Sequence, residues 1–309
     1  MATNALGNRP WPEPPLDYLP SIRREEVRWP HGARLAVIVY VNIEYFRYDL
    51  PSPMALTPPQ ADRTPDVINY TWRDYGIRVG VWRTMEVLDK HGVKPTVVLN
   101  SEVCRAYPIV VEECLKRDWE IASHGVTNSV HIYGRPPDEQ RAIIRESIDT
   151  IKQATGKVPR GWLSPGLSES FDSLQILWEE GFRYVAEWGI NDDLPYPFTV
   201  GDGTMLAIPY PQETNDLPMF IRLQRSAEEG YRQFVDQFDV LYKESERNGK
   251  VMTISLHPYI IGVPHRIKVL DRVLEYIKSR DRVWFAKAEE VEDWYRTHCL
   301  SAIARARES

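Results

Sequence analysis

Runs of consecutive apolar, mostly β-branched residues are the feature that most constrains the fold of this 309-residue chain. The first run is ARLAVIVYVNIEYF (33–46), and KPTVVLN (94–100) and KVMTISLHP (250–258) follow the same pattern. Continuous rather than alternating apolar character is typical of strands that are buried on both faces of a parallel sheet. The sequence therefore predicts an α/β fold.

Segments with helical apolar spacing separate these strands. They include VGVWRTMEVLDKHGV (79–93) and DEQRAIIRESIDTIKQATG (138–156), and Gly92 and Gly156 stand where helices commonly stop. Alternating strands and helices with right-handed crossovers wind into a parallel sheet or barrel. We therefore expect one barrel-like domain over 34–298, preceded by a proline-rich extended arm (1–33) and followed by a short tail (299–309).

Composition excludes several functional classes. A net charge of −6 supplies no basic stripe for nucleic acid, and no apolar run is long enough for a membrane span. The proline-rich N-terminus has no apolar signal region, and the three cysteines are an odd number without CxxC spacing. We therefore predict a cytoplasmic protein that acts on a small molecule, with no nucleic-acid or membrane partner.

Polar residues that directly follow apolar strands are the candidates for chemistry, because reactive groups project from the carboxyl ends of strands in such folds. Asn42 and Glu44 point to one side of the first strand. His124 ends the run WEIASH, and Asn128 and His131 follow it. An isolated carboxylate or histidine at such a place is more often structural, so these residues alone do not establish a site.

Three further segments qualify in the same way. Arg160 precedes the rigid turn Pro165–Gly166, Asp193 lies in NDDLPY (191–196), and His257 ends the strand of LHPYIIGVPHR (256–266). Arginine near a carboxylate most often neutralises it, and two aspartates before LPY are also common in turns or helix caps. His257 and His124 are the strongest candidates for proton transfer or metal binding, because they stand at strand ends.

Taken in this order, the five segments resemble the polysaccharide deacetylase superfamily, the NodB-homology fold, from about Arg34 to Trp294. NDDLPY and LHPxxxGxPxR are similar to segments of the branch that contains metal-independent allantoinases and cyclic-imide hydrolases. The resemblance implies a distorted (β/α) barrel of about seven or eight parallel strands. It also implies a homo-oligomer that hydrolyses C–N bonds of amides or N-acetyl sugars.

The chain departs from the typical sugar deacetylases of this superfamily. Asn42 stands at the position of the general base, Glu44 at that of a metal-ligating aspartate, and Asn128 at that of the second histidine of a zinc site. Asparagine does not accept a proton at neutral pH, and its oxygen is a poor zinc ligand. The resemblance therefore implies either one divalent ion, zinc, held by Glu44, His124 and Asn128, or no metal.

The main hypothesis is hydrolysis of a small, cyclic amide, imide or ureide. Glu44, or an ion held by Glu44 and His124, would activate water, and His257 would protonate the leaving nitrogen. Burial beside Tyr45 and Phe46 is expected to raise the pKa of Glu44 toward neutrality.

The remaining site residues complete this hypothesis. Arg160 would orient Glu44 or bind a substrate carboxylate, and Asp193 would hold Arg160 or the tautomer of His257. Residues expected to contact the substrate are Asn42, Tyr45, Trp72, Asn128, Pro165, Trp188 and Arg266. Two alternatives stay open, a metal-dependent deacetylase of N-acetylated sugars and a catalytically inactive barrel that binds a small molecule.

Overall fold

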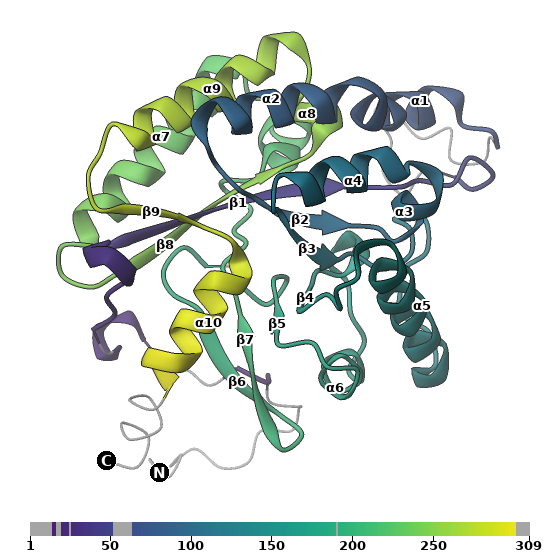
Figure 1. Ribbon diagram of the computed structural model, residues 1–309, viewed down its shortest axis with the longest axis horizontal. Coiled ribbons are helices and arrows are strands. Elements are labelled where there is room, and N and C mark those ends of the chain that lie inside the picture. Colours follow the sequence, from purple (N-terminus) through teal and green to yellow (C-terminus); the bar gives the residue numbers. More distant parts are fainter. Residues whose placement is uncertain (1–13, 17–19, 25, 52–63, 190, 301–309) are drawn as a thin grey trace.

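The computed structural model describes residues 14–16, 20–24, 26–51, 64–189 and 191–300 (Figure 1). Within this part of the chain nine strands form one sheet, in the order β6-β7-β5-β4-β3-β2-β1-β8, and β9 lies beside β1. The strands are β1 Leu35–Ile43, β2 Thr96–Leu99, β3 Glu120–Ser123, β4 Gly161–Trp162, β5 Tyr184–Val185, β6 Tyr196–Val200, β7 Gly203–Ala207, β8 Lys250–Leu256 and β9 Val283–Ala286.

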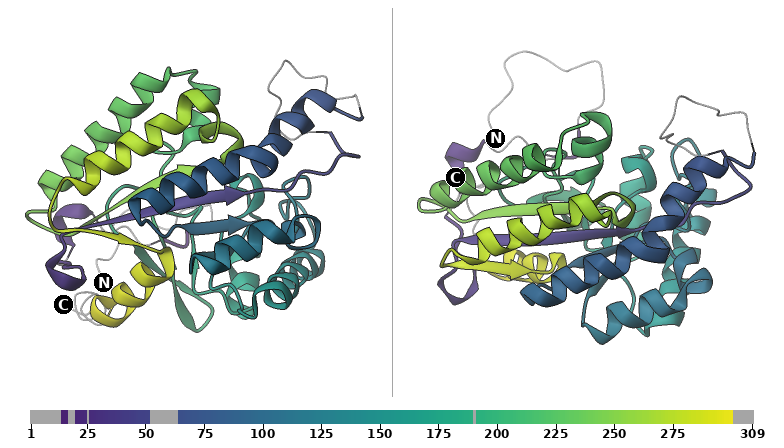
Figure 2. Two further views of the ribbon diagram at one scale, coloured as in Figure 1. Left: turned by 45° about the horizontal axis from the view of Figure 1, so that its top comes forward. Right: turned by 90° about the horizontal axis from the view of Figure 1, so that it is seen from above.

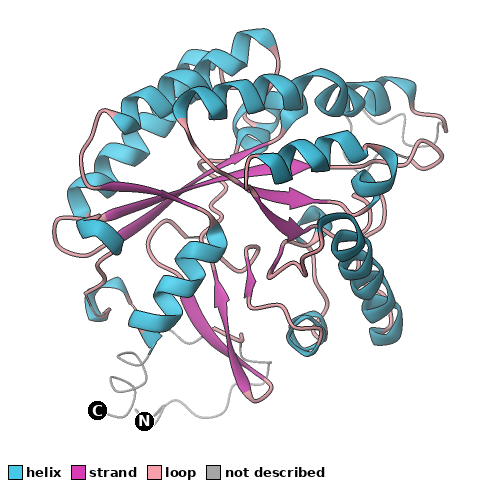
Figure 3. Ribbon diagram, viewed as in Figure 1, coloured by secondary structure: helices cyan, strands magenta, loops and turns pink. Residues whose placement is uncertain are grey.

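The sheet is parallel except for β6, which forms an antiparallel hairpin with β7. It curls into a half-barrel, as Figure 3 shows, which confirms the predicted distorted (β/α) barrel. Loops rather than a strand lie along the free edge of β8. The backbone N–H of Val251 donates to the carbonyl of Asp193, and that of Ser255 donates to the carbonyl of Thr214. One loop therefore meets the beginning of β8 and the other its carboxyl end.

Helices cover the outer face of the curled sheet (Figure 2). Their bounds are α1 Val67–Tyr75, η3 Gly76–Gly80, α2 Val81–His91, α3 Glu102–Ala106, α4 Pro108–Lys116, α5 Pro137–Thr155, α6 Ser173–Glu179, η5 Pro218–Arg222, α7 Ala227–Glu244, α8 Pro258–Ile261, α9 Pro264–Lys278 and α10 Ala288–His298. As predicted, α2 and α5 end before Gly92 and Gly156, which adopt the left-handed backbone that favours glycine. None of the described helices is long and apolar enough to cross a membrane.

The two faces of β1 explain its continuous apolar sequence. Leu35, Val37 and Val39 belong to a core cluster shared with α2, α7 and α9, whereas Ala36 and Ile38 belong to a second cluster inside the half-barrel. Successive side chains of a strand point to opposite faces, so both sets must be apolar. The carboxyl end of β1 is thereby held between two packed layers, which fixes the positions of Asn42 and Glu44.

Residues 1–13 of the predicted arm and residues 301–309 of the predicted tail are not among the described residues. Within the described part of the arm, Trp29 is buried, and its indole Nε1 donates to the carbonyl oxygen of Lys250 at 2.8 Å. The arm therefore packs on the first residue of β8. The domain limits 34 and 298 stay predictions.

Candidate active site

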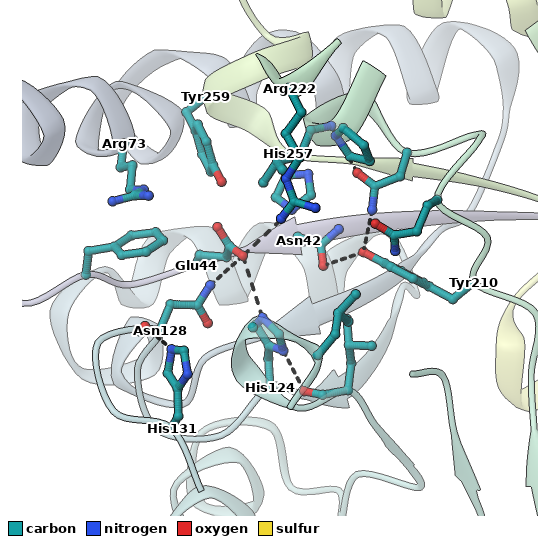
Figure 4. A pocket seen from close by; sticks show the side chains of 18 residues that line it. Asn42, Glu44, Arg73, His124, Asn128, His131, Tyr210, Arg222, His257 and Tyr259 are labelled. Carbon is teal, nitrogen blue, oxygen red and sulfur yellow. Dashed lines mark hydrogen bonds and ion pairs between the residues drawn. The ribbon is translucent and has the colours of Figure 1, made fainter. Parts of the chain in front are cut away.

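The carboxyl ends of β1, β3 and β8 meet at a cavity of about 280 Å³ (Figure 4). Parallel strands end at the same edge of a sheet, so residues far apart in sequence converge there. The predicted residues that line this cavity are Asn42, Glu44, Asn128, His124 and His257. His131, whose part the sequence left open, lines it as well.

Glu44 stands between two histidines. Its Oε1 lies 3.6 Å from Nε2 of His124 and 3.8 Å from Nε2 of His257. His124 directs its Nδ1 to the backbone carbonyl of Leu163 at 2.5 Å, which requires a proton on that nitrogen. The ring therefore presents Nε2, rather than Nδ1, to the carboxylate.

Asp216 holds His257 in the corresponding orientation. One oxygen of this fully buried carboxylate accepts the backbone N–H of His257 at 2.8 Å, and the other lies 2.7 Å from Nδ1 of the ring. Nε2 of His257 therefore points into the cavity, as Figure 4 shows. Asp216 was not predicted as a site residue, although TNDLP (214–218) repeats much of the predicted NDDLP segment (191–195).

Burial and charge shift the pKa of Glu44 in opposite directions. Burial raises it, but the nearby His257, His124 and Arg73 outweigh burial, so the net shift is downward. The expectation that this pKa rises toward neutrality is therefore wrong. These neighbouring side chains, whose distances from Glu44 cannot be read from the sequence, favour its ionised form.

His257 shows the reverse balance. Burial lowers the pKa of its ring, but the carboxylates of Asp216 and Glu44 raise it, and the net shift is upward. Its ring therefore keeps a proton to a higher pH than an ordinary histidine. This property suits a group that donates a proton to a leaving nitrogen.

A chain of side-chain amides fixes the orientation of Asn128. Asn100 Oδ1 accepts the backbone N–H of Tyr45, so Nδ2 of Asn100 must face the carbonyl of His124 and Oδ1 of Asn128. Asn128 consequently donates its Nδ2 to Glu44 Oε1 at 2.5 Å. Its oxygen is already engaged and points away from the carboxylate.

This orientation does not fit the metal site that the resemblance implies. Asn128 presents N–H hydrogens rather than an oxygen to the place where an ion on Glu44 would sit. Within the described ranges there is also no group of three or more His, Cys, Asp or Glu side chains placed to hold a metal ion. Glu44, His124 and Asn128 do lie together, but Asn128 turns no ligand oxygen toward the other two, so the three side chains do not fit the predicted metal site.

Arg160 and Asp193 lie away from the cavity, so their predicted catalytic roles are wrong. Arg160 directly precedes β4 and therefore lies at the amino ends of the strands, whereas the cavity lies at their carboxyl ends. It pairs with Glu292 and Asp293 of α10. Asp193 binds Lys250 at 2.6 Å, at the beginning of β8, and also pairs with Arg24. Neither residue reaches Glu44 or His257, and Asp216 performs the role expected of Asp193.

Most of the predicted substrate contacts also lie outside the cavity lining. Trp72 packs edge-on against Tyr259, and the ring of Tyr45 lies tilted against that of Tyr107. Trp188 donates its indole N–H to Glu169, and Arg266 lies over the ring of Phe220. Pro165 is buried against Gly125. These residues support the walls rather than form them, whereas Asn42 and Asn128 do line the cavity.

Several lining residues have no signal in the sequence. Tyr210 donates its hydroxyl to Oδ1 of Asn42 at 3.1 Å, and the amide Nδ2 of Asn42 donates to the carbonyl of Leu256. Asn42 is therefore an anchor between β1 and β8. Tyr259, whose pKa burial and Glu44 raise well above its usual value, keeps its proton beside that carboxylate. Tyr210 comes from the loop after β7, which carries no regular pattern, and Tyr259 comes from the short helix α8.

Comparison with known proteins identifies the family. A model of the polysaccharide deacetylase family matches residues 60–185. A protein of Schizosaccharomyces pombe named "Putative polysaccharide deacetylase" is 30% identical over 250 residues, which is 74% of this chain and 77% of that protein. A peptidoglycan deacetylase of Helicobacter pylori is 22% identical over 70% of this chain and 83% of its own length.

Solved structures show the same fold. The "probable Polysaccharide deacetylase" of Pseudomonas aeruginosa PAO1 superposes with a TM-score of 0.80 at 28% identity, covering 88% of this chain and 94% of that chain. Puue allantoinase superposes with a TM-score of 0.83 at 24% identity, covering 94% and 98%. The chain therefore belongs to the polysaccharide deacetylase family and is a hydrolase of carbon–nitrogen bonds other than peptide bonds.

Proposed function

We propose that this enzyme hydrolyses a small, cyclic amide, imide or ureide, as the allantoinase-like branch that it resembles in sequence does. The observation that carries the proposal is the pairing, across one small cavity, of an ionised Glu44 with a His257 held by Asp216. This arrangement places a base opposite an acid, and Asn128 presents N–H rather than a metal ligand beside them. It therefore suits hydrolysis by proton transfer.

The size of the cavity supports a small substrate. Its volume of about 280 Å³ lies just below the range of about 300–1,000 Å³ typical of small-ligand pockets. The polar side chains that line it include Asn42, Glu44 and His257, all three of them buried. A compact ring with several carbonyl and N–H groups would match such a lining.

The proposed reaction balances without a further reactant. Glu44 takes a proton from water as the water oxygen bonds to the amide carbon. The carbonyl electron pair moves to its oxygen, beside the protonated His257. As this pair returns, the C–N bond breaks and Nε2 of His257 protonates the leaving nitrogen. The proton on Glu44 then passes to His257, 3.8 Å away, through one water.

A deacetylase of N-acetylated sugars is the second candidate. The names of the relatives from S. pombe and H. pylori favour it. The orientation of Asn128 opposes it, because a metal that polarises the acetyl group would need an oxygen or nitrogen ligand where this side chain presents N–H. This candidate predicts acetate release that depends on added zinc.

The test is turnover of a panel of cyclic amides, imides and ureides, with N-acetylglucosamine oligomers alongside. We expect acid or ammonia release from a ring compound, and a loss of about 10²- to 10⁴-fold in kcat for Glu44→Gln and His257→Ala. Glu86→Gln, an exposed change on α2, is the matched control. Ligand binding without turnover, unchanged by both active-site variants, would instead favour the inactive small-molecule-binding barrel.

A further inference from the structure

Among the described charged side chains that line the cavity, one arginine has no partner of opposite charge. Glu44 lies in the field of Arg73, and Asp216 pairs with His257 at 2.7 Å. Arg222 is the other arginine that lines the cavity. Across the part of the chain that the structure describes, no ion pair or hydrogen bond engages its guanidinium. A chain of net charge −6 therefore keeps an uncompensated positive charge at this cavity.

Arg222 stands at the mouth of the cavity. It is the last residue of η5 and is exposed to solvent, and its side chain points into the cavity in Figure 4. Other arginines nearby are engaged, since Arg266 lies over Phe220 and Arg73 over Phe46. An exposed arginine is usually just solvated, so its position needs a second observation before it indicates a ligand.

Gln212 supplies that observation. It lines the same cavity, and its Nε2 is buried without a hydrogen-bond partner among the described residues. A buried amide N–H without an acceptor is unfavourable unless a ligand supplies one. Gln212 and Arg222 both belong to the connection between β7 and α7, so one segment offers the cavity two sets of unused donors.

We propose that Arg222 binds a carboxylate carried by the substrate, with Gln212 donating to an acceptor on the same molecule. A guanidinium matches a carboxylate through two parallel hydrogen bonds and is the side chain best suited to this group. The inference rests on the proposed function and narrows it. The substrate class becomes a cyclic amide, imide or ureide that bears a carboxylate outside the bond that is cleaved.

The experiment compares two ring compounds that differ only in this charge, hydantoin-5-acetate and hydantoin-5-acetamide. Calorimetry measures their binding to the wild type, Arg222→Gln, Arg222→Lys and Arg225→Gln. Arg225→Gln removes an equal charge three residues away, at a side chain that does not line this cavity. Kinetic assays of the same proteins give the ratio of kcat/KM for the acid over the amide.

We expect Arg222→Gln to raise the Kd of the acid about 10- to 100-fold and to lower the kcat/KM ratio by the same factor, as loss of a charge-assisted hydrogen bond requires. Arg222→Lys should recover part of the loss, and Arg225→Gln should match the wild type. An unchanged Kd for the acid in Arg222→Gln would overturn the carboxylate site. Failure of the wild type to open any ring refutes the proposed function, whereas the calorimetric comparison still decides the role of Arg222.

Discussion

Replacing Asp216 by asparagine tests how the active site controls its acid. The carboxylate is fully buried and accepts two hydrogen bonds from His257, one from its backbone N–H and one from its ring. Asparagine keeps the shape but loses the charge, and its NH₂ group must face one of these two nitrogens. The variant therefore weakens the attraction that raises the pKa of His257.

The magnitude follows from the lost charge-assisted hydrogen bond, which contributes about 1.5–3 kcal/mol. Since about 1.4 kcal/mol corresponds to one pKa unit, the pKa of His257 should fall by about one to two units. His257 must be protonated to act as the acid, so activity is lost as pH rises through this pKa. In Asp216→Asn the decline should therefore begin at a pH about one to two units lower, and kcat at a pH above both pKa values should fall about 10- to 100-fold.

The assay is a pH–rate profile, together with NMR titration of the ring of His257. Asp172→Asn, an exposed change at the N-terminus of α6, is the control. Thermal unfolding should show that Asp216→Asn is folded, although an unsatisfied buried donor costs about 1–3 kcal/mol. A folded variant whose profile and ring titration coincide with those of the wild type would refute the assignment of Asp216 and His257.

Three further predictions concern the metal, the turn after β8 and the base of the barrel. Prolonged chelation should leave kcat/KM within about twofold of its starting value, because Asn128 presents N–H hydrogens to Glu44, and a loss that zinc restores would contradict this. Gly80→Ala should lower the free energy of unfolding, measured by urea titration, by at least about 1–3 kcal/mol. The added Cβ would lie 2.0 Å from the carbonyl oxygen of Pro258, which directly follows His257, so activity should fall as well. Burial and Glu289 raise the pKa of Glu120 to about 7, so the folded state favours the protonated form of this carboxyl group. The resulting stabilisation of the folded state is fully present below about pH 4.5 and is lost as the pH rises through about 7. Glu120→Gln should remove up to about 3 kcal/mol of this decline in unfolding free energy between pH 5 and 8, and an unchanged pH dependence would contradict the shift.

The part of the site on regular strands could be predicted from the sequence. Apolar runs marked β1, β3 and β8. In a parallel sheet, the residues at or just after the carboxyl ends of these strands must meet at one edge. Glu44, His124 and His257 were predicted on this ground, and the structure brings them together. Their mutual electrostatics could not be predicted, because the pKa of Glu44 depends on its distances from side chains that lie 29 to 213 residues away in the sequence.

The loop residues show why the remainder was missed. NDDLP (191–195) and TNDLP (214–218) look alike, but the first lies beside Lys250 at the beginning of β8 and the second beside His257 at its end. Which loop reaches which end depends on the path of the chain around the β6–β7 hairpin, which has no local sequence signature. The cytoplasmic location and the homo-oligomer stay predictions.

Hydrolysis of cyclic amides by metal-depleted wild-type protein tests the central claim most directly. Acid release in a pH-stat, with zinc content measured on the same sample, gives turnover and metal occupancy together. We predict ring opening of at least one cyclic amide, imide or ureide at a zinc content far below one per chain, abolished by Glu44→Gln. Absence of turnover by the depleted enzyme with activity restored in proportion to bound zinc would contradict the account.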